Sequence, residues 1–481
     1  MEDPTKTNKK LALSKDSSNI ITGLDLGGQG IKVLDNVIFC YNSIKELLLN
    51  NNEIEVIPKD IYKLRKLEKL NLSNNKIKSI PTELGKLVTL KELYLNDNAI
   101  TAVPLELGGL HNLEVLNLAN NPLIAPFCEM AREKSLLRFC RENNTNYKPP
   151  ADRAWIDTVI KTDPHLEAIS VGTYNILTNY WASKLTYAPS WVINAECRKE
   201  TILQNIIAYN LDILCLQEVE IPMYHEYFKD NLAQRLDYES VFLPKRKDAS
   251  KRIATSHGQA TFWKKSKFTL IEQIDVEFLT KIKNDPRLRG ANDILHRFED
   301  KTHTALFTVL NHTILNCTII ISNVHLFWDP EFEDVKLLQS IILIDELEKV
   351  KNKYKTAQVL LMGDFNSTCN STVVEYILQR KILPSVFLPY SYGDFDEGSR
   401  HNLRFENSYD QQDITFTNFT PSYKGVIDHI FYSENLFLIA VISPVEDVYT
   451  ERTIGLPNIH FPSDHILIGA KFHLKDKKQN K

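Results

Sequence analysis

Leucine recurs at a fixed interval through the first third of the chain. Five leucines share a spacing of 23 residues and stand at Leu24, Leu47, Leu70, Leu93 and Leu116. The frame L-x-x-L-x-L-x-x-N recurs around them, and the four later repeats close it with an asparagine, at Asn52, Asn75, Asn98 and Asn121. Gln29 stands in that place in the first repeat, which suits an edge repeat. This period predicts a solenoid in which each repeat supplies a short strand, an asparagine that bonds neighbouring backbones and a return segment.

The ends of this leucine-rich-repeat region need a cover, because a terminal repeat cannot bury its own apolar face. Residues 127–143 carry apolar side chains at helical spacing and are expected to cap the last repeat. The paired prolines Pro149-Pro150 cannot continue a helix, so a linker is expected after the cap. We therefore predict a flexible tail over 1–18, repeats with a helical cap over 19–148 and a linker over 149–165.

The hydrophobic pattern changes from residue 166 onwards. Six short apolar runs predict strands, at 169–174, 213–216, 318–323, 358–362, 425–432 and 465–472. Three longer stretches with helical spacing separate them, at 196–210, 332–351 and 372–379. Strands that alternate with helices predict a layered α/β or α+β domain built on a sheet. We assign this domain to residues 166–474 and treat 475–481 as a basic tail.

Composition narrows the class of protein. The chain has 481 residues, of which 43% are hydrophobic and 25% charged, as in an ordinary globular protein of two or more domains. Its net charge of −4 argues against a wholly basic nucleic-acid-binding surface. Seven scattered cysteines, without a Cys-x-x-Cys pair, argue against a disulfide framework or a zinc site. We find neither a signal peptide nor an apolar run of ~18 residues, and expect a cytoplasmic and nuclear protein that uses no membrane.

Six short polar motifs mark the second region, each at the end or edge of an apolar run. They are Thr173-Tyr174-Asn175, Leu216-Gln217-Glu218, Asn323-Val324-His325, Gly363-Asp364-Phe365-Asn366, Ile427-Asp428-His429 and Ser463-Asp464-His465. Loops at one rim of a rigid sheet can converge on a single site. Carboxylates, amides and imidazoles are the groups that hold Mg²⁺, contact a phosphate and activate a water. The set predicts a phosphodiesterase, because six unrelated loops would not share one chemical theme.

Two of these motifs are ambiguous when each is taken alone. Glu218, at the end of the apolar run 213–216, can hold a hard cation. A solvated glutamate after a buried strand is nevertheless the more common case. Asp364 and Asn366 face the same side of an extended chain and suit water alignment and phosphate contact. An Asx-rich turn explains them equally well.

Histidine is the natural acid or base near neutral pH. His465 opens the last predicted strand, and Asp428 is available to fix its tautomer. His429 is expected to point away from the site, because neighbours on a strand alternate between faces. His325 is a second imidazole that could bind the scissile phosphate, although a lone histidine in such a place is more often structural.

These motifs resemble the endonuclease/exonuclease/phosphatase superfamily, whose fold is a four-layer α/β sandwich with a magnesium-dependent site. Within it the chain is similar to the leucine-rich-repeat deadenylases of the carbon catabolite repressor type, which join the same two modules. The matching stretches are Tyr174-Asn175-Ile176-Leu177, Leu216-Gln217-Glu218-Val219-Glu220, Trp328-Asp329-Pro330-Glu331-Phe332, Asp334-Val335-Lys336-Leu337 and Lys424-Gly425-Val426-Ile427-Asp428. The resemblance covers residues from about 20 to 474.

The resemblance implies a role for each matching position. The implied metal ligands are Glu218 and Asp464. The implied catalytic residues are Asp364, Asp428, His465, Glu218 and His325, with Asp428 orienting His465. The implied substrate-binding residues are Asn175, Asn366, Pro330 and Tyr423. Of these, Asn366, Pro330 and Tyr423 match positions that hold the terminal adenine in the family.

The implied reaction is hydrolysis of the 3′-terminal phosphodiester of mRNA poly(A) with release of 5′-AMP. Mg²⁺ is the implied cofactor, with two ions as the family expectation. The concave strand positions of the repeats mix polar and apolar residues without a basic excess, which favours a protein partner over RNA. By resemblance this partner is a second deadenylase subunit of the ribonuclease D-like class, which bridges to a NOT scaffold. A repeat domain that merely packs on the catalytic domain stays an alternative.

The chain departs from the family pattern at two places. His257-Gly258-Gln259-Ala260 stands where the family reads Asp-Gly-Cys-Ala, and Lys301-Thr302-His303 where Lys-Asp-Asn is expected. A basic cluster formed by Lys245, Arg246, Lys247, Lys251 and Arg252 could guide the RNA tail, but a solvated loop is the usual case and we leave it outside the site. A catalytically weak scaffold subunit remains an alternative, as does a phosphodiesterase for another nucleotide or a phospholipid head group.

Overall fold

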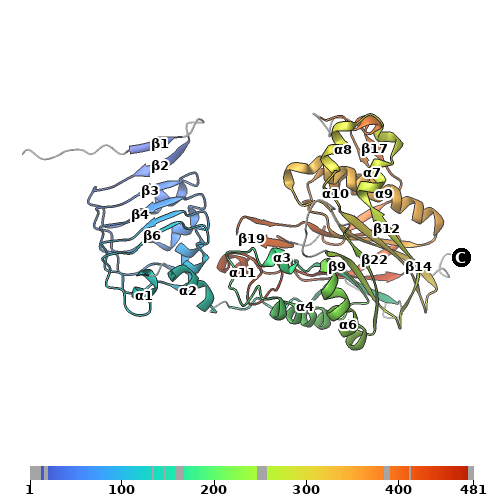
Figure 1. Ribbon diagram of the computed structural model, residues 1–481, viewed down its shortest axis with the longest axis horizontal. Coiled ribbons are helices and arrows are strands. Elements are labelled where there is room, and N and C mark those ends of the chain that lie inside the picture. Colours follow the sequence, from blue (N-terminus) through green and yellow to red (C-terminus); the bar gives the residue numbers. More distant parts are fainter. Residues whose placement is uncertain are drawn as a thin grey trace, which may run out of the picture. The chain divides into compact units, whose positions relative to one another are not determined.

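The computed structural model describes residues 12–15, 20–132, 135–145, 148–158, 167–245, 257–383, 390–410 and 413–474. The chain forms two compact units (Figure 1). The first contains the chain up to Lys148 together with 185–191 and 450–454, and the second contains the remainder. No described helix has both the length and the apolar character required to cross a membrane.

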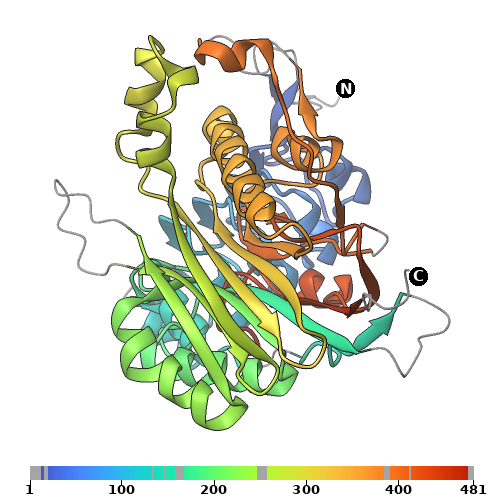
Figure 2. The same cartoon turned by 90° about the vertical axis from the view of Figure 1, so that its right-hand side faces the viewer.

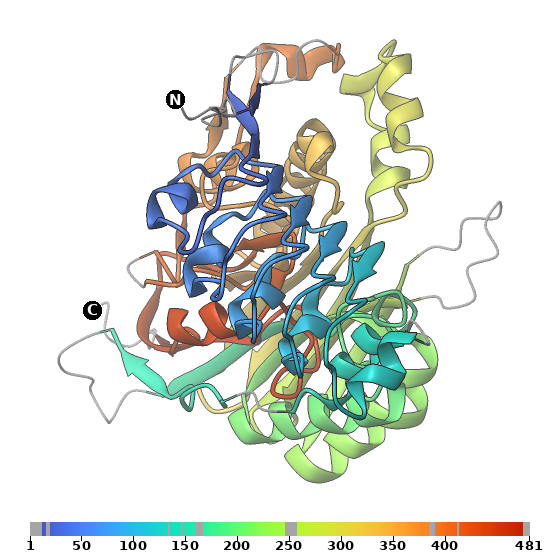
Figure 3. The ribbon, with the colours of Figure 1, turned by 90° about the vertical axis from the view of Figure 1, so that its left-hand side faces the viewer.

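The first unit is a stack of parallel strands, seen in order in Figure 3. They are β2 (Ile21–Asp25), β3 (Glu46–Leu48), β4 (Lys69–Asn71), β5 (Glu92–Tyr94) and β6 (Val115–Asn117). The register places Leu47 opposite both Leu24 and Leu70, so the 23-residue period of the sequence becomes the ladder of the sheet. Short 3-10 helices form the return segments: η1 (Asn36–Cys40), η2 (Lys59–Lys63), η3 (Thr82–Lys86) and η4 (Leu105–Gly109).

The repeat asparagines join adjacent turns of the solenoid. Asn75 Nδ2 donates to the carbonyl oxygens of Leu49 at 2.9 Å and Leu72 at 3.1 Å, while its Oδ1 accepts the Ile54 N–H at 3.0 Å. Asn98 repeats this pattern one turn later. Because buried backbone groups require partners, these amides replace the ladder bonds that a turning chain cannot make.

Both ends of the stack are covered. β1 (Ala12–Lys15) pairs antiparallel with β2, although it lies inside the segment 1–18 that we expected to be a flexible tail. At the other end the predicted helical cap consists of two helices, α1 (Phe127–Arg132) and α2 (Leu136–Asn143). α2 buries Leu136 and Cys140 against the repeat core.

The second unit is built on two mixed sheets. The seven-stranded sheet has the order β10-β11-β9-β8-β23-β22-β7, and the six-stranded sheet has the order β12-β13-β14-β15-β21-β18. The first contains β7 (Trp155–Asp157), β8 (Ala168–Asn175), β9 (Ile213–Glu220), β10 (Tyr238–Pro244), β11 (His257–Lys264), β22 (Leu436–Ile442) and β23 (Ile468–Leu474). The second contains β12 (Phe268–Glu277), β13 (Thr304–His312), β14 (Cys317–His325), β15 (Gln358–Asp364), β18 (Phe405–Asn407) and β21 (Asp428–Ser433).

The sheets pack face to face and are covered by helices on their outer faces (Figure 2). In β15, Leu360 and Met362 point into the core between the sheets, whereas Val359 and Leu361 pack toward α9 (Glu333–Lys353). Burial on both faces explains why β15 is apolar throughout rather than alternating. α10 (Thr372–Gln379) joins α9, and α4 (Ala195–Tyr209) with α6 (Lys229–Leu236) covers the other sheet. The predicted four-layer α/β sandwich is confirmed.

Local differences from the sequence analysis have simple causes. The segment 149–165, expected as a linker, includes β7, which pairs with β22 as an edge strand. Our domain limits themselves stay predictions. The last strand begins at Ile468 rather than at His465, because His465 forms only an isolated bridge with Asn418. Asp428 begins β21 instead of ending a strand.

Candidate functional site

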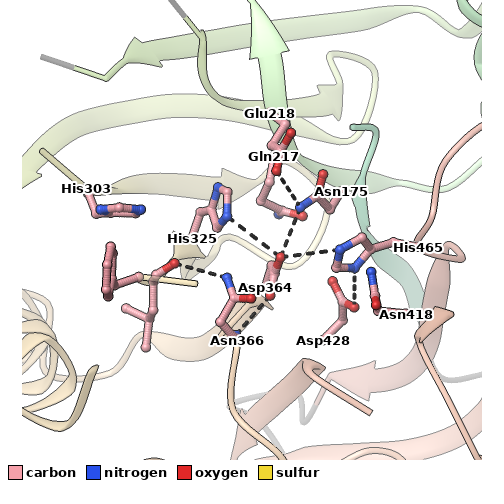
Figure 4. A network of polar contacts seen from close by, with 12 residues as sticks. Asn175, Gln217, Glu218, His303, His325, Asp364, Asn366, Asn418, Asp428 and His465 are labelled. Carbon is pink, nitrogen blue, oxygen red and sulfur yellow. Dashed lines mark hydrogen bonds and ion pairs between the residues drawn. The ribbon is translucent and has the colours of Figure 1, made fainter. Parts of the chain in front are cut away.

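The site forms where strands from both sheets end close together (Figure 4). Asn175 is the last residue of β8, His325 the last of β14 and Asp364 the last of β15. β14 and β15 run parallel, so His325 and Asp364 lie at the same register position. Asn175 Nδ2 donates to Asp364 Oδ2 at 2.9 Å, which joins the two sheets across the sandwich.

Asp364 is the centre of the network. Its Oδ1 accepts the Asn366 N–H at 2.9 Å. Its Oδ2 lies 3.6 Å from His465 Nε2 and 3.7 Å from His325 Nε2. Burial, followed by the charge of Asp428, raises the pKa of Asp364 to about 7, against the opposing effects of His465 and Asn175. A carboxyl that titrates near neutral pH can take up and release a proton during turnover.

His465 is oriented by a carboxylate. Its Nδ1 lies 2.8 Å from Asp428 Oδ2, which leaves Nε2 directed at Asp364. Burial would lower the pKa of His465, but Asp428, Asp464 and Asp364 together raise it well above its ordinary value. The charged imidazolium with both nitrogens protonated is therefore favoured. Asp428 is itself fixed because its N–H donates to Thr417 Oγ1 at 3.0 Å.

The sequence pattern placed Glu218 at the end of a strand. In the structure Glu218 lies within β9, which continues to Glu220. Its φ of 59° interrupts the regular strand, and its carboxylate contacts the end of the neighbouring strand β8 and the loop that follows it. Oε1 accepts Asn175 Nδ2 at 3.3 Å, and Oε2 accepts the Thr178 N–H at 2.9 Å. Burial would raise the pKa of Glu218, but His325, His257, the Thr178 N–H and His465 lower it to about 2. Glu218 is therefore ionised at neutral pH.

Asp464 belongs to the site through a residue that the sequence analysis missed. Asn418 Nδ2 donates to Asp464 Oδ2 at 3.1 Å, and Asn418 also bridges to His465 through the backbone. Burial raises the pKa of Asp464, and the charge of Glu218 adds to this effect against His465. Asn418 carries no motif of its own, so only the pairing of its strand with the 463–465 segment reveals it.

The predicted substrate-binding residues lie on one side of this network. Asn366 Nδ2 donates to the Leu326 carbonyl at 3.1 Å, which holds the amide beside the end of β14. Lys336 Nζ donates to the Asn366 carbonyl at 3.0 Å and connects Asn366 to the segment that contains Pro330. Pro330 is exposed at the start of η7 (Pro330–Phe332), outside the hydrogen-bonded network.

Tyr423, in β20 (Tyr423–Gly425), is 38% exposed, which suits a ring that stacks on a base. Burial raises the pKa of its hydroxyl to about 12, and the charges of Asp364 and Asp428 contribute. The structure brings seven of the predicted residues into one bonded network, and their roles stay predictions: Asn175, Glu218, His325, Asp364, Asn366, Asp428 and His465.

The donor set fits a hard divalent cation. Ligand atoms of Asp364, Asp428 and His465 lie within 4.8 Å of one another. Asp428 Oδ1 and Gln217 Oε1 are buried oxygens without a hydrogen-bond partner among the described residues. One oxygen of Asp428 already binds His465, and the roles of Glu218 and Asp464 as metal ligands stay predictions. Buried negative charge with oxygen ligands is what Mg²⁺ prefers.

Neighbouring residues of the motifs have structural roles. His429 points away from the site, as strand alternation predicts, because its Nε2 lies 2.8 Å from the Ser367 carbonyl and its ring contacts Phe365. Arg198, which sequence reasoning missed, is buried and donates to the carbonyls of Leu177 and Pro462. It thereby fixes the two loops that follow Asn175 and precede Asp464. A charged residue on the buried face of α4 was the signal that could have identified it.

Comparisons with known proteins identify both parts of the chain. Residues 172–465 match the model of the Endonuclease/Exonuclease/phosphatase family. Leucine-rich-repeat models match three overlapping stretches, 21–77, 42–100 and 65–123. Among solved structures, ANGEL2, a 2′,3′-cyclic phosphatase in complex with adenosine-2′,3′-vanadate, has a TM-score of 0.56 and 23% identity over 67% of this chain and 99% of that chain. This likeness shows the fold alone.

Curated relatives resemble the chain over most of its length. A protein of Enterocytozoon bieneusi (strain H348), named probable CCR4-Not complex 3'-5'-exoribonuclease subunit Ccr4, is 60% identical over 98% of this chain and 99% of its own. A protein of the same name from Vairimorpha ceranae (strain BRL01) is 48% identical over 73% of this chain and 74% of its own. The Mycosarcoma maydis CCR4-Not complex 3'-5'-exoribonuclease subunit Ccr4 is 34% identical over 71% of this chain and 57% of its own.

Proposed function

Because this chain belongs to the endonuclease/exonuclease/phosphatase family and is a leucine-rich-repeat deadenylase of the Ccr4 type, we propose that it is a Mg²⁺-dependent exoribonuclease that shortens mRNA poly(A) tails in the 3′ to 5′ direction. Each cycle adds one water across the terminal phosphodiester, releases 5′-AMP and leaves a new 3′-hydroxyl. The observation that carries the proposal is the continuous network from Asp428 through His465 and Asp364 to Asn175 and Glu218.

The network divides the chemical work between two groups with perturbed pKa values. Asp364, with a pKa of about 7, accepts a proton from the attacking water as the water oxygen bonds to phosphorus. His465, whose pKa is raised so that it stays an imidazolium, stabilises the negative charge that develops on the phosphate. Asp428 fixes the orientation of the ring. The bond from phosphorus to the departing 3′-oxygen then breaks and that oxygen takes up a proton from solvent, while Asp364 releases its proton to solvent and completes the cycle.

Glu218 and Asp464 would hold divalent cations. The family expectation is two ions. When bound, the metal neutralises the phosphate and stabilises the attacking and departing oxygens. The ionised state of Glu218, with its pKa of about 2, is the state required of a ligand. Asn175 donates to Glu218 and to Asp364 and so keeps the ligand and the base in a fixed relation.

Preference for adenine would come from Asn366, Pro330 and Tyr423. Tyr423 is half-exposed beside the carboxylates and offers a stacking face for the terminal base. The Asn366 side chain keeps one N–H and its oxygen for the edge of the base, because one N–H is used by the Leu326 carbonyl.

We further propose that the repeats bind a second deadenylase subunit of the ribonuclease D-like class, which connects the enzyme to a NOT scaffold. The names of the relatives place those proteins in a CCR4-Not complex, and the concave repeat surface supports a protein partner. Lys69 on β4 lies between Glu46 and Glu92, at 3.1 and 3.7 Å, so this surface alternates in charge instead of being basic. We also propose a cytoplasmic and nuclear location.

The function is tested with the purified full chain and labelled RNA that ends either in A₂₀ or in twenty residues of another base. With Mg²⁺ we expect stepwise shortening of the A tail, and with EDTA none. Glu218→Gln should lower the rate by at least about 10³-fold, since it removes a ligand charge. Glu220→Gln is the matched control: it lies on the same strand and is buried, but its carboxylate binds Asn179 instead of the site.

Each contrary outcome selects one of the alternatives. Equal rates on all tails would remove the claim for adenine. Absence of RNA turnover with every divalent metal would favour a scaffold subunit with a weak or inactive catalytic domain. Turnover of a different nucleotide phosphate or of a phospholipid head group, but not of RNA, would keep the hydrolase and change its substrate.

A further inference from the structure

A cluster of nitrogen bases lies beside the catalytic network and has no part in the mechanism above. It consists of Lys245, His257 and His303, and it includes both positions at which the chain departs from its family pattern. Arg246, Lys247, Lys251 and Arg252 of the basic cluster lie outside the described residues. In Figure 4, His303 lies beyond His325 as seen from Asp364.

Lys245 and His303 are in direct contact. Lys245 Nζ lies 2.9 Å from His303 Nε2. Because an ammonium group can only donate, His303 accepts through Nε2 and is the neutral tautomer that carries its proton on Nδ1. The His303 ring stands edge-on to His325 at 5.8 Å between centroids and to Phe327 at 5.4 Å. These ring contacts fix the imidazole and thereby fix the position of the lysine amine.

His257 is brought to the same place by strand pairing. The Lys245 N–H donates to the His257 carbonyl at 2.7 Å, where β10 and β11 meet. His257 also pairs with Glu220 on β9, two residues beyond Glu218. Lys245 and His257 therefore come from one sheet, where β10 ends and β11 begins. His303 comes from the other sheet and directly precedes β13.

The side chains of the cluster are poorly hydrated. Burial, followed by the charge of Lys245, lowers the pKa of His257 to about 4 and that of His303 well below its ordinary range. Burial lowers the pKa of Lys245 itself to about 8, with Glu218 and Asp364 acting in the opposite direction. An anion that binds beside this cluster would meet an amine whose position is already fixed by His303.

We propose that Lys245, positioned by His303 and flanked by His257, binds the RNA backbone phosphate next to the scissile one. The proposal rests on the function proposed above, because it takes the ligand to be an RNA chain. The scissile phosphate belongs at Asp364 and His465, on the far side of His325. The terminal nucleotide has no phosphate on its 3′ side, so the adjacent phosphate must be the one 5′ of the penultimate nucleotide.

Binding without turnover gives the most direct test. The full chain is titrated with fluorescent A₁₀ RNA in EDTA at several salt concentrations. For single strands, each neutralised phosphate contributes about 0.7 to the slope of log K against log salt. We expect Lys245→Gln to reduce this slope by about 0.7 and to weaken binding about tenfold at low salt. Lys349→Gln, which removes an exposed lysine on α9 that pairs with Glu346, should leave the slope unchanged.

A modified RNA identifies the phosphate. An A₁₀ with a neutral methylphosphonate at the linkage 5′ of the penultimate nucleotide should bind the wild-type protein about tenfold more weakly. The same RNA should show no further loss with Lys245→Gln, because the charge pair is already absent. Additive losses would overturn the proposal. So would a wild-type protein that is insensitive to this methylphosphonate, a result that requires no variant to fold.

The role of His303 has its own comparison. His303→Gln keeps an acceptor near the Nε2 position, whereas His303→Phe keeps only the ring. We expect His303→Phe to reduce the salt slope as Lys245→Gln does and His303→Gln to restore it.

During turnover, Lys245→Gln should lower the ratio of kcat/KM on A₁₀ to kcat/KM on the dinucleotide ApA about tenfold, because ApA lacks the second phosphate. An unchanged ratio would place Lys245 at the scissile phosphate and overturn the proposal. A failure of RNA hydrolysis itself would count against the proposed function, while the binding measurements would still report on this subsite.

Discussion

At the scale of single residues, Asp364 shows how catalytic use opposes stability. It is buried beside Asp428, and these two effects raise its pKa from 3.8 to about 7. The folded state therefore retains a proton that the unfolded chain would lose. Between about pH 4 and pH 7 the unfolded state alone releases this proton, so the contribution of Asp364 makes folding less favourable as pH rises.

We predict that Asp364→Asn is inactive but more stable than wild type at high pH. The neutral amide removes the cost of an ionised buried carboxyl, about 2–4 kcal/mol once the pH exceeds 7. At pH 5 the folded wild-type protein still retains this proton, so the advantage should be smaller by about 2–3 kcal/mol than at pH 8. Thermal unfolding in EDTA at pH 5 and pH 8 measures this difference. A gain of the same size at both pH values would show that the effect is one of packing and not of ionisation.

At the scale of elements, one glycine decides how closely β14 and β15 approach. Gly363 has a φ of 146°, and a Cβ built on it would lie 2.0 Å from the Val324 carbonyl oxygen. His325 and Asp364 are the next residues on the two strands. The contact that brings the base and the imidazole together therefore depends on the absence of a side chain at position 363.

We predict that Gly363→Ala destabilises the second unit by about 3–5 kcal/mol, because a backbone oxygen cannot give way without separating the strands. Activity should fall as well, since Asp364 moves with its strand. Gly290→Ala is the matched control: its φ of 86° is also positive, but no atom lies within 4 Å of the added Cβ. It should cost only about 1–2 kcal/mol and leave turnover intact. Equal losses in unfolding free energy for both variants would contradict the close-approach argument.

The elements were the most predictable level of the structure. Helix α10 coincides with its predicted range, and α4 and α9 differ from theirs only at the ends. β9 was harder to predict, because it continues through the positive φ of Glu218. A left-handed residue within a strand leaves no hydrophobic pattern, so the sequence indicated that the strand ended there.

At the scale of the whole molecule, the repeat strands present a surface of alternating charge. Lys69 on β4 is part of a charge ladder with Glu46 and Glu92 on the neighbouring strands. Such exposed pairs contribute little to folding, so their alternation is available for recognition. A protein partner with complementary charges would sense a reversal of Lys69.

We predict that Lys69→Glu weakens capture of the proposed ribonuclease D-like partner by at least about tenfold, since it places three acidic side chains in a row. The free energy of unfolding should change by less than about 1 kcal/mol. Lys78→Glu makes the same charge change at an exposed residue outside the strands and should leave capture intact. Surface plasmon resonance with the purified partner measures both. Equal effects of the two variants would indicate that only net charge matters.

The sequence alone determined the solenoid, the layered α/β domain and the identity of the polar motifs. Periodic leucines and apolar runs are local signals that follow from burial, and they are visible along the sequence itself. The alternation that turns His429 away from Asp428 was predictable for the same reason.

Tertiary structure decided which polar groups meet and what charge they carry. Asn418 reaches Asp464, Arg198 fixes two distant loops and Lys245 meets His303 only because folding brings distant segments of the chain together. The raised pKa of Asp364 and the lowered pKa of Glu218 arise from burial and from neighbours far away in the chain. Two carboxylates of similar chemistry thus have very different pKa values, because electrostatic environment is a property of three-dimensional packing.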